Sequence, residues 1–417
     1  RHMRIAVIGG GSSYTPELVK GLLDISEDVR IDEVIFYDID EEKQKIVVDF
    51  VKRLVKDRFK VLISDTFEGA VVDAKYVIFQ FRPGGLKGRE NDEGIPLKYG
   101  LIGQETTGVG GFSAALRAFP IVEEYVDTVR KTSNATIVNF TNPSGHITEF
   151  VRNYLEYEKF IGLCNVPINF IREIAEMFSA RLEDVFLKYY GLNHLSFIEK
   201  VFVKGEDVTE KVFENLKLKL SNIPDEDFPT WFYDSVRLIV NPYLRYYLME
   251  KKMFKKISTH ELRAREVMKI EKELFEKYRT AVEIPEELTK RGGSMYSTAA
   301  AHLIRDLETD EGKIHIVNTR NNGSIENLPD DYVLEIPCYV RSGRVHTLSQ
   351  GKGDHFALSF IHAVKMYERL TIEAYLKRSK KLALKALLSH PLGPDVEDAK
   401  DLLEEILEAN REYVKLG

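Results

Sequence analysis

Residues 4–17 of the chain have the sequence RIAVIGGGSSYTPE. The continuous apolar run at residues 5–8 is typical of a strand that is buried on both faces of a parallel sheet. Three glycines follow at residues 9–11, and Thr-Pro-Glu at residues 15–17 is typical of the first turn of a helix. This order of strand, glycine turn and capped helix predicts the first unit of a doubly wound α/β fold.

Further along the chain, short apolar runs alternate with helical stretches. The runs predict four more strands, at residues 34–37, 76–79, 136–139 and 160–163. The second half is mostly helical, with strand-like runs at 313–317 and 332–340 and long amphipathic helices at 356–375 and 399–413. We therefore predict a Rossmann-like domain at residues 3–200 that binds NAD, and a mixed α/β, largely helical domain at residues 201–417 for substrate and oligomer contacts.

The glycine turn suits a dinucleotide. Glycines allow a tight turn and let backbone N–H groups approach a pyrophosphate at a helix N-terminus. A carboxylate at the end of the second strand is placed to accept from a ribose hydroxyl, which favours NAD over NADP. The third glycine of the usual fingerprint is replaced by Tyr14, and the alternative is a tight turn without a ligand. The predicted cofactor-binding residues are Gly9, Gly10, Gly11, Ser12, Ser13, Tyr14 and Asp38.

Composition excludes several classes of protein. The 417 residues contain 59 Lys and Arg against 66 Asp and Glu, a net charge of −7, which argues against a nucleic-acid partner. No apolar run approaches the roughly 20 residues of a membrane span, and no signal peptide precedes the first strand. The two cysteines, Cys164 and Cys338, rule out a disulfide framework and favour a reducing compartment. We expect a cytoplasmic protein without a membrane partner.

Cys164 and His194 lie at, or just past, predicted strand ends. A thiolate and a neutral imidazole are both good ligands for a transition metal, and two protein ligands leave coordination positions open for a substrate that chelates through its own oxygens. The alternative is a buried cysteine and a hydrogen-bonded structural histidine. The residue types alone leave both interpretations open.

A second glycine-rich stretch occupies residues 104–111, after Lys-Gly-Arg-Glu at residues 87–90. Such a loop could close over a sugar or phosphate, with Arg89 as a bidentate phosphate ligand. The alternative is a surface loop with solvated charges.

Six ordered motifs together resemble glycoside hydrolase family 4. They cover the chain from Arg4 almost to its C-terminus: VIGGGSSYTP (7–16), GQETTG (103–108), TNPSG (141–145), GLCNVP (162–167), GLNH (191–194) and NLPDD (327–331). The resemblance implies an enzyme that depends on NAD and a divalent metal, with a fold like that of lactate and malate dehydrogenases. The family is an exception to the scheme in which glycosidases use a pair of carboxylates.

The resemblance further implies oxidation followed by elimination. NAD⁺ takes hydride from C3 of the sugar, a tyrosine removes the acidified C2 proton, and the C1–O bond breaks. Water then adds and the hydride returns. A divalent ion, with Mn²⁺ the first choice, would bind the C2 and C3 oxygens and stabilise the enediolate.

The resemblance assigns roles to individual residues. Cys164 and His194 match the metal ligands, and Asn142 and Asn165 match positions that hold sugar hydroxyls. We select Tyr243 as the base, although tyrosine ionises near pH 10 unless a cation or metal lies beside it. The remaining assignments are Arg89 and Arg263 for a substrate phosphate and Glu105 for tuning the tyrosine.

The residue after Cys164 separates branches of the family. Members that act on 6-phospho-α-glucosides usually have Asp there, whereas Asn165 followed by Val-Pro resembles the 6-phospho-β-glucosidase branch. Since Asn is a poor general acid, the source of leaving-group protonation stays open, with water as one candidate. The predicted reaction is hydrolysis of 6-phospho-β-glucosides, such as cellobiose-6-phosphate, to glucose-6-phosphate by a homodimer or homotetramer.

The alternative function is an NAD-dependent 2-hydroxyacid dehydrogenase of the lactate/malate type. The motif at residues 141–143 and the glycine turn are compatible with that group. The Asp-x-x-Arg helix and paired catalytic His that the group needs are not found at suitable spacing.

Overall fold

The structure is a computed structural model that describes residues 2–216, 218, 220–293 and 295–417. In these residues a nine-stranded sheet has the order β13-β12-β11-β6-β5-β4-β1-β2-β3. The strands from β3 to β6 run parallel and come from the first 162 residues: β1 (Arg4–Ile8), β2 (Glu33–Tyr37), β3 (Lys60–Ile63), β4 (Tyr76–Phe79), β5 (Thr136–Asn139) and β6 (Phe160–Gly162).

This parallel part is doubly wound. Strand β1 pairs with β2 on one side and β4 on the other, so the strand order reverses beside it. Ile5, Ala6 and Val7 are fully buried, as the apolar run predicts. In open α/β sheets the ligand lies at the carboxyl ends of the strands beside such a reversal, and that is where the glycine turn lies. The predicted Rossmann-like fold is confirmed.

Local patterns locate most of these strands closely. Strands β4 and β5 match the predicted ranges, and β2 and β6 differ from theirs by one residue. Helix α1 (Thr15–Ile25) begins where Thr-Pro-Glu predicts. Strand β3 is not among the predicted strands. It lies at the sheet edge with its residues partly or fully exposed, and its apolar run covers only residues 61–63.

The second half of the chain completes the same sheet. Strands β11 (Lys313–Arg320), β12 (Val333–Arg341) and β13 (Arg344–Thr347) form an antiparallel extension. It joins the parallel part where Asn318 pairs with Gly162. The predicted division at residue 200 falls inside β8 (Leu195–Val203). The two-domain division stays a prediction, and the large sheet draws strands from both of its parts.

A smaller antiparallel sheet consists of β7 (Val185–Leu192), β8, β9 (Glu206–Asp207) and β10 (Ile239–Val240). Strands β7 and β8 form a hairpin in which Leu192 pairs with Leu195. Asn193 and His194 are the two residues of its turn. His194 has φ +66°, a left-handed conformation that is uncommon for a residue other than glycine. The hairpin therefore presents His194 at its tip.

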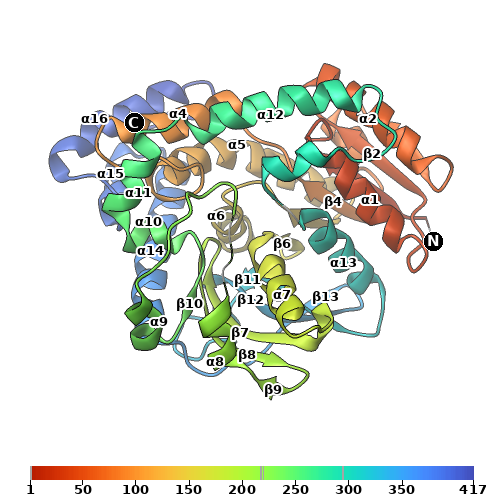
Figure 1. The fold of residues 1–417 in the computed structure, drawn as a ribbon. Helices are drawn as coiled ribbons and strands as arrows, with labels where there is room; N and C mark the ends of the chain where they lie inside the picture. The colour runs from red at the N-terminus through yellow and green to blue at the C-terminus, as the bar shows by residue number, and fades with distance from the viewer. Residues whose placement is uncertain (1, 217, 219, 294) are drawn as a thin grey trace.

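Helices cover both sheets (Figure 1). Helix α12 lies across the top of the view and contacts α4 at one end and α2 at the other. The remaining bounds are α2 (Glu41–Val55), α3 (Phe67–Val71), α4 (Gly85–Leu97), α5 (Gly108–Thr132), α6 (Ser144–Glu149), η1 (Phe150–Tyr154), α7 (Val166–Met177), η2 (Leu182–Asp184), α8 (Thr209–Asn215), α9 (Thr230–Val236), α10 (Leu244–Leu248), α11 (Glu250–Ser258), α12 (Arg263–Tyr278), η3 (Glu286–Arg291), α13 (Tyr296–Glu308), α14 (His355–Lys377), α15 (Lys380–Ser389) and α16 (Val396–Ala409).

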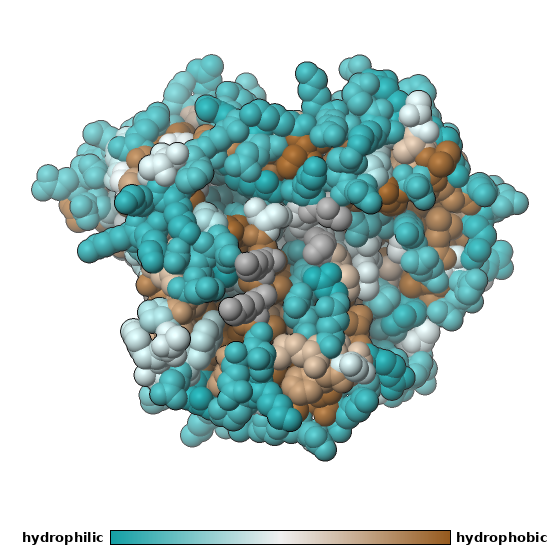
Figure 2. Space-filling view, in the orientation of Figure 1, coloured by the Kyte–Doolittle hydropathy of each residue, from teal (hydrophilic) through white to brown (hydrophobic). Residues whose placement is uncertain are grey.

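The face of the molecule drawn in Figure 2 is mainly polar. On the face drawn in Figure 2, hydrophilic residues predominate and hydrophobic residues lie in separate patches. Among the residues that the structure describes, no helix combines the length and the apolar composition that a membrane crossing requires.

Candidate active site

A cavity of about 940 Å³ opens at the carboxyl ends of the parallel strands. One part of its wall is the glycine turn after β1, and another part is formed by Asn165, His194 and Tyr243. Gly9, Gly11, Ser12, Tyr14, Asp38, Glu105 and Asn142 also line it. A single cavity thus joins the predicted cofactor residues to most of the predicted catalytic residues.

The glycine turn is closely packed against its neighbours. Gly9 has φ +92°, and a Cβ there would lie 2.7 Å from the backbone nitrogen of Phe81, so a side chain does not fit. The Gly11 N–H donates to Asp38 Oδ2 at 2.7 Å. Burial raises the pKa of Asp38, although the N–H groups of Asp40 and Gly11 counteract it. The turn and the end of β2 are thereby held as one unit.

Two predicted cofactor residues lie outside the cavity lining. A Cβ on Gly10 would collide with Phe36 and Gln44, so this glycine permits close packing. The Ser13 hydroxyl is fully buried and donates to Glu271 at 3.1 Å. Their predicted contact with a cofactor stays a prediction.

Cys164 and His194 come together although 30 residues separate them. Cys164 follows β6 and His194 forms the β7–β8 turn, and the Cys164 Sγ to His194 Nε2 distance is 3.5 Å. Burial lowers the pKa of His194 to about 4, so its imidazole is neutral at pH 7. Burial, reinforced by the Glu335 charge, raises the pKa of Cys164 to about 12. The thiol and imidazole can both ligate a divalent transition metal, and a bound cation would favour the thiolate.

Few other ligands are available to such an ion. Within the described part of the chain, no group of three or more His, Cys, Asp or Glu side chains forms a possible metal site. A divalent ion at Cys164 and His194 would therefore keep open positions for oxygens from elsewhere, as an ion that binds substrate requires.

Tyr243 packs directly on His194. The two rings are stacked with centroids 3.9 Å apart and an interplanar angle of 11°. The Tyr243 N–H donates to Asn241 Oδ1 at 3.0 Å, and Asn241 Nδ2 donates to Ser196 on β8 at 2.9 Å. Burial raises the pKa of Tyr243 well above 10, and the charges of Glu105 and Cys164 add to this effect. Tyr243 is therefore a neutral phenol until a cation is placed beside it.

Asn142 and Asn165 occupy two strand ends that face this pair. Asn142 follows β5 and is joined to Pro143 by a cis peptide bond. Asn165 precedes the first turn of α7, and its Oδ1 lies 3.8 Å from Cys164 Sγ. Both asparagines line the cavity, so each amide is within the space that a sugar beside Cys164 and His194 would occupy.

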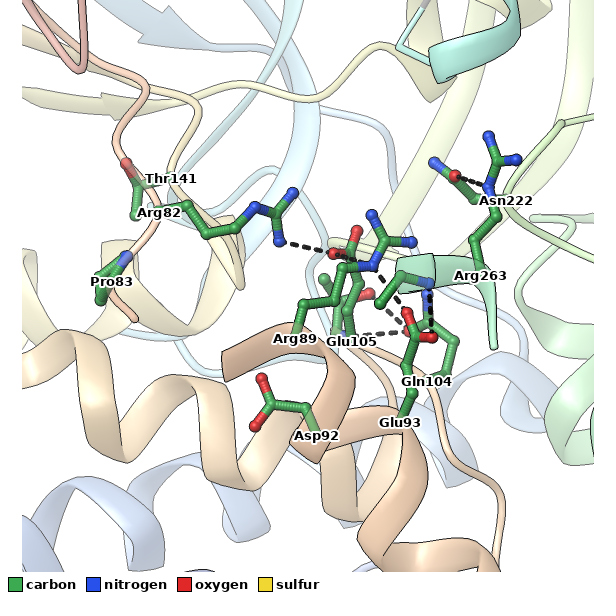
Figure 3. Close-up of polar contacts among 12 residues, drawn as sticks. Arg82, Pro83, Arg89, Asp92, Glu93, Gln104, Glu105, Thr141, Asn222 and Arg263 are labelled. Carbon is green, nitrogen blue, oxygen red and sulfur yellow. Dashed lines mark hydrogen bonds and ion pairs between the residues drawn. The ribbon is translucent and has the colours of Figure 1, made fainter. Parts of the chain in front are cut away.

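Glu105 lies at the centre of an arginine cluster (Figure 3). Its Oε2 is 2.8 Å from Arg82 Nη1 and 3.0 Å from Arg89 Nε. Burial opposes ionisation, but Arg89, Arg82 and Arg291 outweigh it and lower the pKa of Glu105 to about 2. Glu105 is therefore ionised throughout the physiological pH range and gives the cavity wall a fixed negative charge.

The predicted phosphate arginines are already bonded within the protein. Arg89 is 1% exposed and its Nε donates to Glu93 Oε2 at 2.7 Å. Arg263 donates from Nε to Asn222 Oδ1 at 2.9 Å (Figure 3). Neither arginine is part of the cavity lining, which Glu105 and Asn222 form in front of them. Their predicted role stays a prediction.

Many lining residues are absent from the sequence-based candidates, including the following four polar side chains. Gln80 donates to Gly9 O at 3.2 Å and to Thr15 Oγ1 at 2.7 Å, and so fixes the glycine turn. Arg291 lies over the Tyr14 ring and pairs with Glu271 at 2.9 Å. The other two are Arg82 and Tyr296. The signals that could have found them are the strand end before Pro83 and the glycine pair at residues 292–293.

Comparison with known proteins identifies the family. The family described as Family 4 glycosyl hydrolase matches residues 4–180, and its C-terminal domain matches residues 189–393. A protein of Bacillus subtilis (strain 168) described as "Probable 6-phospho-beta-glucosidase" is 38% identical, with 99% of this chain and 97% of the relative covered. A solved structure of a 6-phospho-β-glucosidase from Thermotoga maritima with manganese, NAD⁺ and glucose-6-phosphate is 99% identical, covers both chains fully and has a TM-score of 0.98.

The alternative dehydrogenase function has support only at the level of the fold. A lactate dehydrogenase from Eimeria maxima is 14% identical with a TM-score of 0.55 over 90% of this chain. That likeness confirms the predicted architecture and carries no argument about activity. The family matches span both halves of the chain, and the prediction from the six motifs is confirmed: the chain belongs to glycosyl hydrolase family 4.

Proposed function

We propose that this chain hydrolyses 6-phospho-β-glucosides, such as cellobiose-6-phosphate, to glucose-6-phosphate, with NAD and a divalent ion such as Mn²⁺ as cofactors. One observation carries the proposal: a single cavity joins the glycine turn to His194 and Tyr243. A hydride acceptor and a metal-bound sugar need to share one space. The descriptions of the relatives at 38% and 99% identity support the same substrate class.

The residues around the glycine turn fit a dinucleotide. The lining has no side chain at Gly9 or Gly11, and a Cβ at either position would press on backbone or on Asp38. Helix α1 begins just beyond the turn, with Pro16 in its first turn, so its N-terminus is suited to a pyrophosphate. Asp38 would accept from a ribose hydroxyl. These residues would hold NAD with its nicotinamide end towards His194.

Cys164 and His194 fit a divalent metal by their donor atoms and by their 3.5 Å separation. When bound, NAD⁺ supplies the hydride acceptor, and the ion supplies positive charge for the C2 and C3 oxygens of the sugar and for an ionised Tyr243. The protein's own contribution is to place Tyr243 against His194, so that its oxygen, once ionised beside the cation, could take the C2 proton of a sugar held there.

Polar residues would orient the substrate at its sugar hydroxyls and at its 6-phosphate. Asn142 and Asn165 would bind sugar hydroxyls, and water would protonate the leaving group because Asn165 cannot serve as a general acid. Arg89 lies directly behind Glu105, and Arg263 directly behind Asn222. A 6-phosphate that reaches Asn222 would find the Arg263 guanidinium behind it, whereas the Glu105 carboxylate stands between the cavity and Arg89.

Location and assembly are part of the same proposal. A phosphorylated sugar and a metal-binding thiol both suit a reducing cytoplasm. The long closing helices α14 and α16 supply extensive surfaces, and we propose a homodimer or homotetramer.

A panel of aryl glycosides tests the proposal. The α and β anomers, each with and without a 6-phosphate, are incubated with NAD⁺, Mn²⁺ and a thiol. We expect aryl release from the 6-phospho-β-glucoside alone and none without NAD⁺. In D₂O the glucose-6-phosphate should carry deuterium at C2. Equal release without NAD⁺, or unlabelled product, would overturn the oxidation–elimination route. Net NADH accumulation with lactate or malate would favour the dehydrogenase alternative instead.

A further inference from the structure

A hydrogen-bond chain of buried and partly buried side chains lies on the Nδ1 side of the His194 ring. Its first member is Gln104, whose Oε1 accepts from the Thr106 N–H at 2.7 Å, the Thr107 N–H at 2.9 Å and the Thr106 hydroxyl at 2.9 Å. Because two backbone N–H groups point at this atom, it is the amide oxygen and not the amide nitrogen. The orientation of the Gln104 side chain is thus determined by the backbone.

The next member is the Thr106 hydroxyl, which has a single proton. That proton is directed to Gln104, and the same oxygen lies 2.8 Å from His194 Nδ1. The Thr106 oxygen therefore accepts from an Nδ1–H group. His194 Nε2 then has a lone pair, and this is the nitrogen 3.5 Å from Cys164 Sγ. The opposite tautomer would place a hydrogen on Nε2 and leave no lone pair there for a metal.

We propose that Thr106, oriented by Gln104, is a positioning residue that keeps His194 in the Nδ1–H tautomer with Nε2 directed at the metal position. The inference rests on the proposed role of Cys164 and His194 as ligands. Stacking on Tyr243 at 11° fixes the plane of the ring, and the Thr106 bond fixes its rotation within that plane. Metal-binding histidines commonly donate their second N–H to such a partner, which also raises the basicity of the ligating nitrogen.

The hydroxyl can be removed while the local fold is kept. The backbone N–H bonds of Thr106 and Thr107 to Gln104 order the turn before α5 and do not depend on the hydroxyl. Thr106→Val has nearly the same shape and deletes the hydroxyl, which removes both the acceptor for His194 and the bond to Gln104. Thr106→Ser restores the hydroxyl. Thr107→Val is the control because Thr107 is the neighbouring threonine, is buried, and does not cap α5 with its side chain.

The test measures Mn²⁺ binding by titration calorimetry on the reduced, metal-free, full-length protein with NAD⁺ present. We expect Thr106→Val to bind Mn²⁺ about 10- to 100-fold more weakly, and Thr106→Ser and Thr107→Val to stay within about twofold of the original chain. The NAD⁺ affinity should be the same in all four proteins. Nitrogen NMR of ¹⁵N-histidine-labelled, metal-free protein should show His194 as the Nδ1–H tautomer in the original chain and a mixture in Thr106→Val.

The outcomes separate this inference from the proposed function. Unchanged Mn²⁺ affinity in Thr106→Val would overturn the inference, and so would an Nε2–H tautomer in the original chain. If Thr106→Ser loses as much Mn²⁺ affinity as Thr106→Val, packing at residue 106 and not the hydroxyl determines the affinity, and the inference is overturned. If His194→Ala binds Mn²⁺ as well as the original chain, the metal site itself is wrong. If only His194→Ala loses binding, the metal site stands and the role of Thr106 is refuted.

Discussion

Replacing Glu105 by Gln should destabilise the protein by about 3 kcal/mol at pH 7. The neighbouring arginines lower the pKa of Glu105 from its ordinary 4.5 to about 2 despite its burial, and one pKa unit corresponds to about 1.36 kcal/mol. Glutamine has nearly the same shape without the charge. Arg89 keeps its partner Glu93 at 2.7 Å, so the loss should stay at the lower end of the roughly 3–5 kcal/mol cost of breaking a buried ion pair.

The pH dependence of this effect has a definite sign. Because the folded-state pKa lies below the unfolded value, the charge stabilises the folded protein fully above about pH 4.5. The stabilisation is then lost as the pH falls from about 4.5 through 2, and Glu105 is protonated in both states only below the folded-state pKa of about 2. The difference between the original chain and Glu105→Gln should therefore be constant from pH 7 to 5 and shrink below pH 4.5.

Guanidinium unfolding followed by circular dichroism measures both the free energy of unfolding at pH 7 and its dependence on pH. Glu405→Gln is the matched control, since Glu405 pairs with Lys98 at 2.8 Å on the surface and such pairs contribute about 1 kcal/mol or less. If Glu105→Gln lowers the free energy of unfolding by no more than Glu405→Gln does, the reasoning is refuted. A difference that does not change between pH 5 and 2.5 would refute it as well, because the stabilisation would then not come from the charge.

Three further substitutions probe the cavity. Cys164→Ser should abolish Mn²⁺-dependent turnover, whereas the NAD⁺ affinity measured by calorimetry should stay unchanged. Retained turnover would mean that Cys164 is not a metal ligand. Asp38→Ala should weaken NAD⁺ binding about 10- to 100-fold, the value of a hydrogen bond to a charged group, without changing Mn²⁺ affinity; equal NAD⁺ affinity would contradict the ribose contact. Tyr243→Phe should lower kcat by about 10²- to 10⁴-fold and stop deuterium entry at C2. The control is Tyr246→Phe, at a buried tyrosine whose ring centroid lies 6.3 Å from that of Tyr243. Continued C2 exchange in Tyr243→Phe would mean that another group is the base.

The features that the sequence predicts correctly are local. The strand, glycine turn and helix of residues 4–25 are determined by neighbouring residues, because an apolar run, three glycines and a Thr-Pro pair suffice to define them. Cys164 and His194 are also locally marked, since each lies at the end of a recognisable strand or turn. Parallel strands align their carboxyl ends, so two such positions could be expected to meet.

The features that it does not predict depend on contacts between distant segments. Arg82 and Arg291 line the cavity because Glu105 and Glu271, more than 15 residues away in the chain, hold them there. Such ion pairs leave no periodic pattern in a sequence. The pairing of β11 with β6 is equally non-local, because it joins Asn318 to Gly162.

One buried carboxylate shows why the two halves of the chain function together. Glu335 on β12 accepts from Asn193 Nδ2 at 3.0 Å and from Asn318 Nδ2 at 3.1 Å. It therefore links the large sheet to the hairpin turn that presents His194. Cys164 follows β6 in that same large sheet, beside β11. The turn that carries His194 is thus supported by strands from beyond residue 300. A division at residue 200 would leave both proposed ligands in one part and Glu335 and Asn318, which support this turn, in the other.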